Sequence, residues 1–172
     1  MLVTDDIQAL SDVVRGPVAL PDSPEFAAET FAFNAATVHR PDVVLGASTA
    51  QDVAAGVKWA AERRLPVAVQ STGHGADSVV EGGLLINTRR LQGLHIDPVE
   101  RTARVGAGVK WRSVLEASVP LGLVGLHGSS TDVGVVGYTV GGGLPVLGRA
   151  HGFAADHVRS MEVVTADGAL RR

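Results

Sequence analysis

The stretch DVVLGASTAQDVAAGVKWAAERRLPVAVQSTGHG, residues 42–75, decides the fold class of this chain. Two short apolar runs within it, 42–47 and 66–70, are rich in valine, which is typical of strands. Between them, Thr49 and Asp52 form a helix-capping pattern, and the apolar residues that follow repeat with the period of a helix. Strand, helix and strand in succession predict a βαβ unit with a right-handed parallel crossover.

The second strand runs directly into STGHG, residues 71–75, in which His74 lies between two glycines. Glycine accepts positive φ angles and lets backbone N–H groups approach a ligand closely. Successive N–H groups of such a loop form a concavity that binds anions. A second glycine-rich stretch spans 128–143. Either loop alone is better explained as tight turns, but the pair, one of them carrying a histidine behind a βαβ strand, favours a site that grips one pyrophosphate.

The composition excludes several classes of protein. The 172 residues, 45% apolar and 19% charged, suffice for one folded domain, which can be built as two lobes. The net charge of −3 and the lack of a long basic run argue against nucleic acid or an anionic membrane as a partner. The chain has no cysteine, and therefore no disulfide or cysteine nucleophile. With no signal-peptide pattern and no apolar run of membrane-spanning length, we expect a cytoplasmic protein.

Further elements are predicted along the chain. They are helices at 4–16 and 110–122, short strands with tight turns at 82–88, 94–97 and 101–108, and irregular chain at 17–26. The glycine-rich residues 128–158 carry little helix or strand signal. The C-terminal end predicts a hairpin, with strands 160–165 and 169–172 and Asp167-Gly168 at the turn.

Standard nucleotide and hydrolase motifs are absent from the sequence. GAGVKW at 106–111 has two of the three glycines of a dinucleotide fingerprint but not the third, and no Walker sequence ends in Gly-Lys-Ser/Thr. There is no Gly-x-Ser-x-Gly nucleophile elbow and no His-Glu-x-x-His zinc helix. The histidines other than His74 are scattered without metal-ligand spacing, so no metal site is expected.

The order of the motifs resembles a known family. The segments are VAVQSTGHGAD (67–77), GGLLINTRRLQGLHIDPVERTARVGAGVKWRSVLEA (82–117), GLVGLHGSSTDVGVVGYTVGGGLPVLGRAHGFAADHV (122–158) and VVTADG (163–168). Together they resemble the FAD-binding domain of berberine-bridge-enzyme-like oxidases, within the vanillyl-alcohol oxidase and p-cresol methylhydroxylase group of flavoproteins. The resemblance runs from about Arg40-Pro41 to Gly168, and PDSPEFAAETFAFN (21–34) fits the segment with which the family's domain begins.

The resemblance implies FAD as the cofactor and a set of residues that bind it. The family's loop carries a histidine that bonds covalently to the 8α-methyl group of the flavin, and His74 occupies that place. The loop holds no lysine or arginine, so its backbone amides are expected to bind the pyrophosphate. The implied cofactor-binding residues are Gln70, Ser71, Thr72, Gly73, His74, Gly75, Ser130, Thr131, Val133, Gly134, Val136, Gly137, Tyr138, Gly141, Gly142, Val163 and Val164.

The sequence departs from the family's pattern at several positions. Gln70 stands where the family has arginine, and Thr72 and Pro145 replace glycines. Ser130 stands where some members have a cysteine. Proline has no N–H and cannot adopt positive φ, so the loop at Pro145 must be remodelled. The family's substrate domain, which supplies the catalytic base, has no counterpart in these residues, so no catalytic residue is assigned.

Several single residues have two interpretations. Tyr138 either touches the flavin ring or caps the core, and Ser130 and Thr131 either bond flavin oxygens or cap a loop. Asp156 is interpreted as a turn or helix cap rather than a base. The tryptophans, Trp59 and Trp111, lie on predicted helices and are expected in the core.

The resemblance implies an α+β, two-lobed FAD-binding domain, with a small parallel βαβ lobe and a mainly antiparallel sheet with flanking helices. We expect the first lobe at about 1–95 and the second at about 96–172, with FAD between them. The implied reaction is hydride transfer from a substrate C–H to flavin N5 with reoxidation by O₂. The alternatives are a stand-alone flavin-binding module, half of a split enzyme without turnover of its own, and a non-covalent flavin reductase that uses a nicotinamide donor. The expected partners are FAD, a small-molecule substrate bound through a missing domain, and another copy or a second polypeptide.

Overall fold

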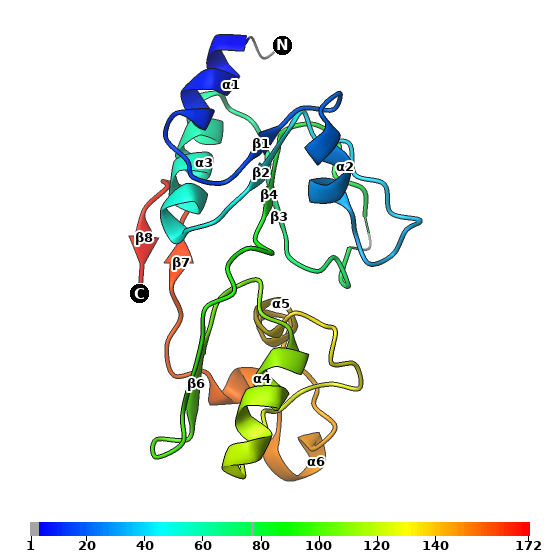
Figure 1. Ribbon diagram of the computed structural model, residues 1–172, viewed down its shortest axis with the longest axis vertical. Coiled ribbons are helices and arrows are strands. Elements are labelled where there is room, and N and C mark those ends of the chain that lie inside the picture. Colours follow the sequence, from blue (N-terminus) through cyan, green and yellow to red (C-terminus); the bar gives the residue numbers. More distant parts are fainter. Residues whose placement is uncertain (1–3, 77) are drawn as a thin grey trace. The chain divides into compact units, whose positions relative to one another are not determined.

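The chain divides into two compact units (Figure 1). The computed structural model describes residues 4–76 and 78–172. One unit comprises Met1–Arg90 and Met161–Arg172, and the other Leu91–Ser160. The boundary differs from the expected one near residue 95, and the C-terminal hairpin belongs to the first unit rather than the second. The physical reason is packing, because a Cβ built on Gly168 at the hairpin turn would lie 3.0 Å from Cβ of Lys58.

The first unit contains the predicted βαβ unit, made of β2 (Val43–Gly46), α3 (Ala50–Glu62) and β3 (Val67–Gln70). Thr49 caps α3 as predicted, since its side chain accepts a hydrogen bond from the N–H of Asp52. The other elements of this unit are α1 (Thr4–Ser11), β1 (Val18–Ala19), α2 (Pro24–Thr30), β4 (Leu84–Asn87), β7 (Val163–Val164) and β8 (Leu170–Arg171). The last two strands form the predicted hairpin and are shorter than expected.

Helix α2 lies where irregular chain was expected. Its first residue is Pro24, and the preceding Ser23 has an extended backbone with φ −87° and ψ 148°. Proline suits the first helical position, because its missing N–H has no partner there and its φ is already helical. In this segment, proline therefore starts a helix rather than interrupting one.

The sheet of the first unit has the order β1-β2-β4-β3. Strands β2 and β3 both run parallel to β4, which lies between them. The crossover from β2 to β3 therefore passes over a strand that comes later in the sequence. The three parallel strands end in register, with Asn87 beside both Gly46 and Gln70. This carboxyl edge is where open parallel sheets bind their ligands.

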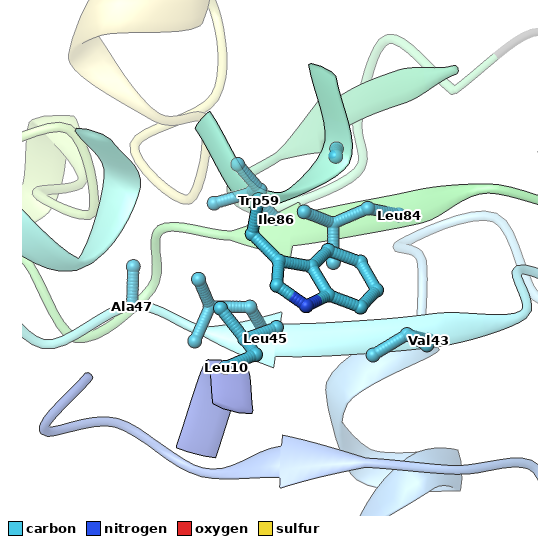
Figure 2. Packing of buried hydrophobic residues seen from close by; sticks show 8 residues of the cluster. Leu10, Val43, Leu45, Ala47, Trp59, Leu84 and Ile86 are labelled. Carbon is cyan, nitrogen blue, oxygen red and sulfur yellow. The ribbon is translucent and has the colours of Figure 1, made fainter. Parts of the chain in front are cut away.

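Helices cover both faces of this sheet. On one face, Trp59 of α3 and Leu10 of α1 pack on Leu45 and Ile86 in the main core cluster (Figure 2). The indole N–H of Trp59 donates to the backbone oxygen of Asp6 at 2.8 Å, so the buried ring keeps a hydrogen bond. On the opposite face, a smaller cluster of Ala19, Val44 and Leu85 packs with Phe26 of α2. The core position predicted for Trp59 is confirmed.

The second unit combines short helices with an antiparallel strand pair. Its elements are β5 (Leu94–Asp97), β6 (Thr102–Val105), α4 (Trp111–Ser118), η1 (Val119–Leu121), α5 (Val135–Val140), α6 (Gly148–His151) and η2 (Ala154–His157). The antiparallel sheet here has two strands, and the glycine-rich residues 128–158 form short helices that the sequence did not predict. Trp111 lies in the core with Val109, Val114 and Val135, as expected. Among the described residues of either unit, no helix has both the length and the apolar character needed to cross a bilayer.

Candidate cofactor site

The loop Ser71–Gly75 leaves the carboxyl end of β3 at the edge where parallel sheets bind ligands. Gly73 has φ +73°, and a Cβ built on it would lie 2.7 Å from Cα of Ala32 and 2.9 Å from the backbone nitrogen of Phe33. Glycine is therefore required at position 73 both by the backbone angle and by the neighbouring segment. Gly75 is different, because a Cβ there would meet nothing within 4 Å.

The side chain of His74 contacts Thr72 and Phe33. Its Nδ1 lies 2.9 Å from Oγ1 of Thr72. Its ring stacks on the ring of Phe33, with centroids 3.8 Å apart and planes inclined by 15°. One contact lies in the plane of the imidazole and the other on its face, so together they fix the direction of the ring. Phe33 was not expected at this site.

Polar groups of the loop are left for a ligand. Within the described residues, the N–H groups of Ser71, Thr72, Gly73 and Gly75 donate no hydrogen bond to another protein group. The hydroxyl oxygen of Ser71 is buried and also lacks a partner in the part of the chain that the structure describes. Buried polar groups without a partner cost free energy. A run of such N–H groups is the arrangement that binds an anion.

Gln70 is turned into the protein. Its Oε1 lies 2.8 Å from Nε2 of His39, and its Nε2 donates to the backbone oxygen of Phe31 at 2.9 Å. The N–H of Val80 donates to Nδ1 of His39 at 3.0 Å, so neutral His39 carries its proton on Nε2 and donates it to Gln70. His39 is thus a buried histidine with both ring nitrogens hydrogen-bonded. The side chain of Gln70 therefore bonds groups of the protein, and a cofactor contact of this residue stays a prediction.

Arg89 connects the loop with the end of α2. Its Nε donates to the backbone oxygen of Ser71 at 3.1 Å, and its Nη1 donates to that of Ala28 at 3.1 Å. Its Nη2 donates to the backbone oxygen of Phe31. Burial lowers the pKa of Arg89, against the opposing effect of Glu29. The sequence reasoning missed Arg89, although its position just after a buried strand of the same edge was a signal that could have found it.

Glu29 and Arg90 form an ion pair at this edge. Nη1 of Arg90 lies 3.0 Å from Oε2 of Glu29, and its Nη2 contacts Oε1. The hydrogen bond to Glu29 raises the pKa of Arg90. A Cβ built on Gly46 would lie 2.4 Å from Nη1 of Arg90, so the absence of a side chain at the end of β2 makes room for this pair.

The remaining predicted residues lie on different elements. Val163 and Val164 form β7 in the first unit. In the second unit, Ser130, Thr131 and Val133 precede α5; Gly134 caps it; Val136, Gly137 and Tyr138 lie within it; and Gly141 and Gly142 follow it. Two of these residues bind the first turn of α4. The backbone oxygens of Thr131 and Val133 accept hydrogen bonds from the N–H groups of Arg112 and Trp111. The hydroxyl of Ser130 accepts from the N–H of Asp132 at 3.3 Å, which is the loop-capping interpretation.

Tyr138 lies in the core of the second unit. Its ring packs edge-on against Trp111, with centroids 5.6 Å apart and planes at 90°. Gly143 lies against it, because a Cβ there would be 2.7 Å from Cε1 of Tyr138. Among the described residues its hydroxyl is buried without a hydrogen-bond partner, and burial raises its pKa. The structure shows Tyr138 packed against the core, and contact of Tyr138 with a flavin ring stays a prediction.

Asp156 caps a short helix, as the sequence predicts. Its Oδ2 accepts a hydrogen bond from the N–H of Phe153 at 3.1 Å, at the start of η2. His157 contacts the backbone oxygen of His151 through Nε2 at 2.8 Å. Over residues 4–76 and 78–172, no three His, Cys, Asp or Glu side chains cluster in a way that could hold a metal ion.

Comparison with known proteins defines the class of protein. A family model described as "FAD binding domain" matches residues 41–172, and the chain belongs to this family. It is therefore an FAD-binding domain of the kind found in flavin-dependent oxidoreductases, and the α+β fold and the family resemblance are confirmed.

Individual relatives cover most of this chain but a small part of their own length. (R)-6-hydroxynicotine oxidase from Paenarthrobacter nicotinovorans is 29% identical over 157 residues, which cover 90% of this chain and 34% of that protein. The crystal structure of 6-hydroxy-D-nicotine oxidase from Arthrobacter nicotinovorans has a TM-score of 0.86 at 29% identity, covering 92% of this chain and 35% of the other. A berberine-bridge-enzyme-like protein of Physcomitrella patens shares the fold, with a TM-score of 0.83 at 21% identity over 95% of this chain and 36% of the other. The chain thus spans about a third of the length of these proteins.

Proposed function

We propose that this chain holds FAD with the loop Ser71–Gly75, attaches the flavin covalently through His74, and serves an oxidoreductase that moves hydride from a substrate C–H. The observation that carries the proposal is the loop itself. Its N–H groups are available to an anion, and they lie beside an imidazole whose direction is fixed by Thr72 and Phe33. FAD held here would supply a hydride acceptor at N5 that O₂ can reoxidise.

The residues of the first unit fit FAD in distinct ways. The N–H groups of Ser71, Thr72 and Gly73 would bind pyrophosphate oxygens, and the buried hydroxyl of Ser71 would gain the partner that it lacks among the described residues. Gly73 keeps a side chain out of the tight contact between the loop and Ala32. Binding of FAD by neutral amide donors should depend on ionic strength less than binding by cationic side chains would.

His74 would lose its ring proton when it attaches. The bond between a ring nitrogen and the 8α carbon replaces one N–H and one C–H bond. Two protons would leave in this exchange, and FAD bound here would supply the acceptor for the two electrons, with O₂ as the final oxidant. The hydroxyl of Thr72, 2.9 Å from Nδ1, would hold the imidazole during this exchange. Because the chain has no cysteine, a second covalent link through a thiolate is excluded for these residues.

The test is an absorption spectrum of the purified protein before and after acid precipitation. Two flavin bands in the native protein and colour in the pellet are expected. In the His74→Ala variant the flavin should stay in the supernatant, with no fluorescent band in a denaturing gel. His95→Ala, which changes an exposed histidine of the second unit, is the matched control and should retain the coloured pellet. Colourless protein that fails to bind added FAD would overturn the whole proposal.

The stand-alone flavin-binding module remains the second candidate. The observation that favours it is that the loop lies within the first unit, whereas the hydroxyl of Tyr138 is buried and the carboxylate of Asp156 caps η2, so neither is placed as a base. The oxidoreductase domain and the stand-alone module require the same FAD site. They differ in whether the protein oxidises a substrate. A small-molecule substrate, a second polypeptide and another copy of this chain belong to the proposal as partners.

A further inference from the structure

Phe33 is an exposed aromatic residue that stacks on the proposed attachment residue. Its exposed fraction is 62%, so little core packing holds it. Nevertheless its ring lies nearly parallel to that of His74, with centroids 3.8 Å apart. An exposed ring stays in one orientation only if its backbone is fixed. On an unrestrained backbone segment the side chain would sample other rotamers.

The side chains of Gln70 and Arg89 link the backbone segments that carry the two stacked rings. The backbone oxygen of Phe31 accepts hydrogen bonds from Nε2 of Gln70, at 2.9 Å, and from Nη2 of Arg89. Gln70 is the residue before the His74 loop, and Arg89 also binds the backbone oxygen of Ser71 within that loop at 3.1 Å. The segment Phe31–Phe33 and the loop Ser71–Gly75 are therefore held to each other by Gln70 and Arg89.

Gly73 lets these two segments approach closely enough for the rings to meet. A Cβ at position 73 would overlap the backbone of Ala32 and Phe33. His39 completes the arrangement, since its Nε2 orients the amide of Gln70 at 2.8 Å. A Gln70 amide with its oxygen bound to His39 directs its NH₂ group towards Phe31.

We propose that Phe33 is the positioning residue of His74, and that Gln70 and Arg89 hold Phe33 over the imidazole. The stack fixes the plane of the ring, and Thr72 fixes its rotation within that plane. A ring nitrogen is thereby aimed in one direction before the flavin arrives, which removes an orientational cost of bond formation. The consequence for attachment rests on the proposed function, whereas the stack is a property of the chain without flavin.

The stack is tested first without cofactor, by NMR of the His74 ring protons in the flavin-free chain. Phe33→Leu removes the aromatic ring, and Phe33→Tyr keeps it. We expect the ring-current shift of His74 to disappear in the leucine variant and to persist in the tyrosine variant. Phe153→Leu, a similarly exposed phenylalanine of the second unit, is the control and should leave the His74 signals unchanged. His74 signals that are identical in the native and Phe33→Leu proteins would overturn the proposal.

The second test measures the rate at which flavin becomes acid-precipitable after FAD is added to the flavin-free chain. Phe33→Leu should slow attachment about tenfold, because a misdirected reacting group loses rate steeply, and Phe33→Tyr should restore it. The non-covalent affinity for FAD should change much less, since Phe33 is not among the groups assigned to the pyrophosphate. Attachment of the leucine variant at the native rate would contradict the role of Phe33. If the native chain binds no FAD, the proposed function fails, and the NMR experiment still decides the stack.

Discussion

At the scale of single residues, Gly73 is the most constrained position of the cofactor site. Gly73→Ala should lower the free energy of unfolding by about 1–3 kcal/mol, since a side chain at φ +73° is strained. It should also weaken FAD binding, because the new Cβ would overlap Ala32. Gly93→Ala, outside the assigned site, is the control, with nothing within 4 Å of its Cβ. Urea unfolding and FAD titration of both variants measure the difference, and equal behaviour of the two would contradict this account of the loop.

Tyr138 provides a prediction about pH. Burial raises its pKa above 10.0, the ordinary value for tyrosine, because the phenolate would be desolvated in the core. The unfolded chain ionises first as pH rises, so this residue should cost the folded state stability from about pH 10 upwards. As Tyr138 is the single tyrosine of the chain, absorbance of the phenolate follows it alone. We expect its titration to coincide with alkaline unfolding; a phenolate formed at an ordinary pKa in the folded protein would contradict the burial.

The variant Tyr138→Phe separates the hydroxyl from the ring. The hydroxyl is buried and has no partner among the described residues, so its removal should leave stability unchanged or raise it slightly. Tyr138→Ala should cost about 3–5 kcal/mol, because it removes the ring packed on Trp111. Thermal unfolding at neutral pH measures both changes. A marked loss in Tyr138→Phe would show that the hydroxyl makes a stabilising bond.

Local sequence identified some residues of the site and missed others. Gly73 and His74 were assigned from the order of several motifs along the chain, because the glycine loop alone is better explained as a tight turn. Phe33 reaches the loop through packing of the segment after α2, and Arg89 reaches it because β4, which precedes it, pairs with β3. Gln70 directs its side chain towards His39, and that direction depends on a residue distant in the sequence.

At the scale of elements, Asp52 joins the start of α3 to the segment before β1. Its carboxylate accepts hydrogen bonds from the N–H groups of Arg15, Gly16 and Ser48 and from the hydroxyl of Thr49. Burial opposes ionisation of Asp52, but the bonds from Thr49 and these backbone groups outweigh it and lower its pKa. The folded state is therefore stabilised by the ionised form.

Replacing Asp52 should destabilise the first unit. Asp52→Ala leaves buried donors without an acceptor, and a loss of about 3 kcal/mol in the free energy of unfolding is expected at pH 7. Since the folded pKa is lowered, the contribution is present above the unfolded pKa, near 3.8, and is lost as pH falls through the folded value. The difference between native and variant should therefore shrink in acid. Urea unfolding at several pH values tests this, with the exposed Asp22→Ala as control.

The elements differ in how well the sequence predicts them. Strand β2, helix α3 and strand β3 carry strong periodic and capping patterns, and the structure has all of them. The order of the sheet was not predictable in the same way, because β4 enters between β2 and β3 through long-range pairing. Short helices such as α5 depend on packing rather than propensity, since isolated helices of this length are unstable.

At the scale of the whole molecule, the proposed cofactor residues are divided between the two units. Residues 70–75 and 163–164 belong to the first unit and 130–142 to the second. The sequence predicted two lobes and assigned the C-terminal hairpin to the second lobe, because it comes last in the chain. Packing on α3 assigns it to the first unit instead. Deleting this hairpin should therefore destabilise α3 and leave the core around Trp111 unchanged.

The last prediction is that this chain alone binds flavin but does not turn over substrate. Hydride transfer needs a substrate held against N5 and a base within reach of the departing proton. The chain's own candidates are engaged elsewhere, with the hydroxyl of Tyr138 in a core and the carboxylate of Asp156 capping η2. The flavin-loaded chain should therefore keep its oxidised absorption band when mixed without oxygen with a panel of sugars and alcohols.

A redox control makes that result decisive. Dithionite should bleach the same sample, because the bound flavin accepts electrons whether or not a substrate site exists. The relatives are about three times as long as the part that this chain matches, since it covers 34% of one and 35% of another, so a substrate site is expected in sequence beyond the match. Rapid bleaching by one sugar or alcohol and not by others would show instead that these 172 residues contain a complete active site, with a base that the present assignment of Tyr138 and Asp156 leaves out.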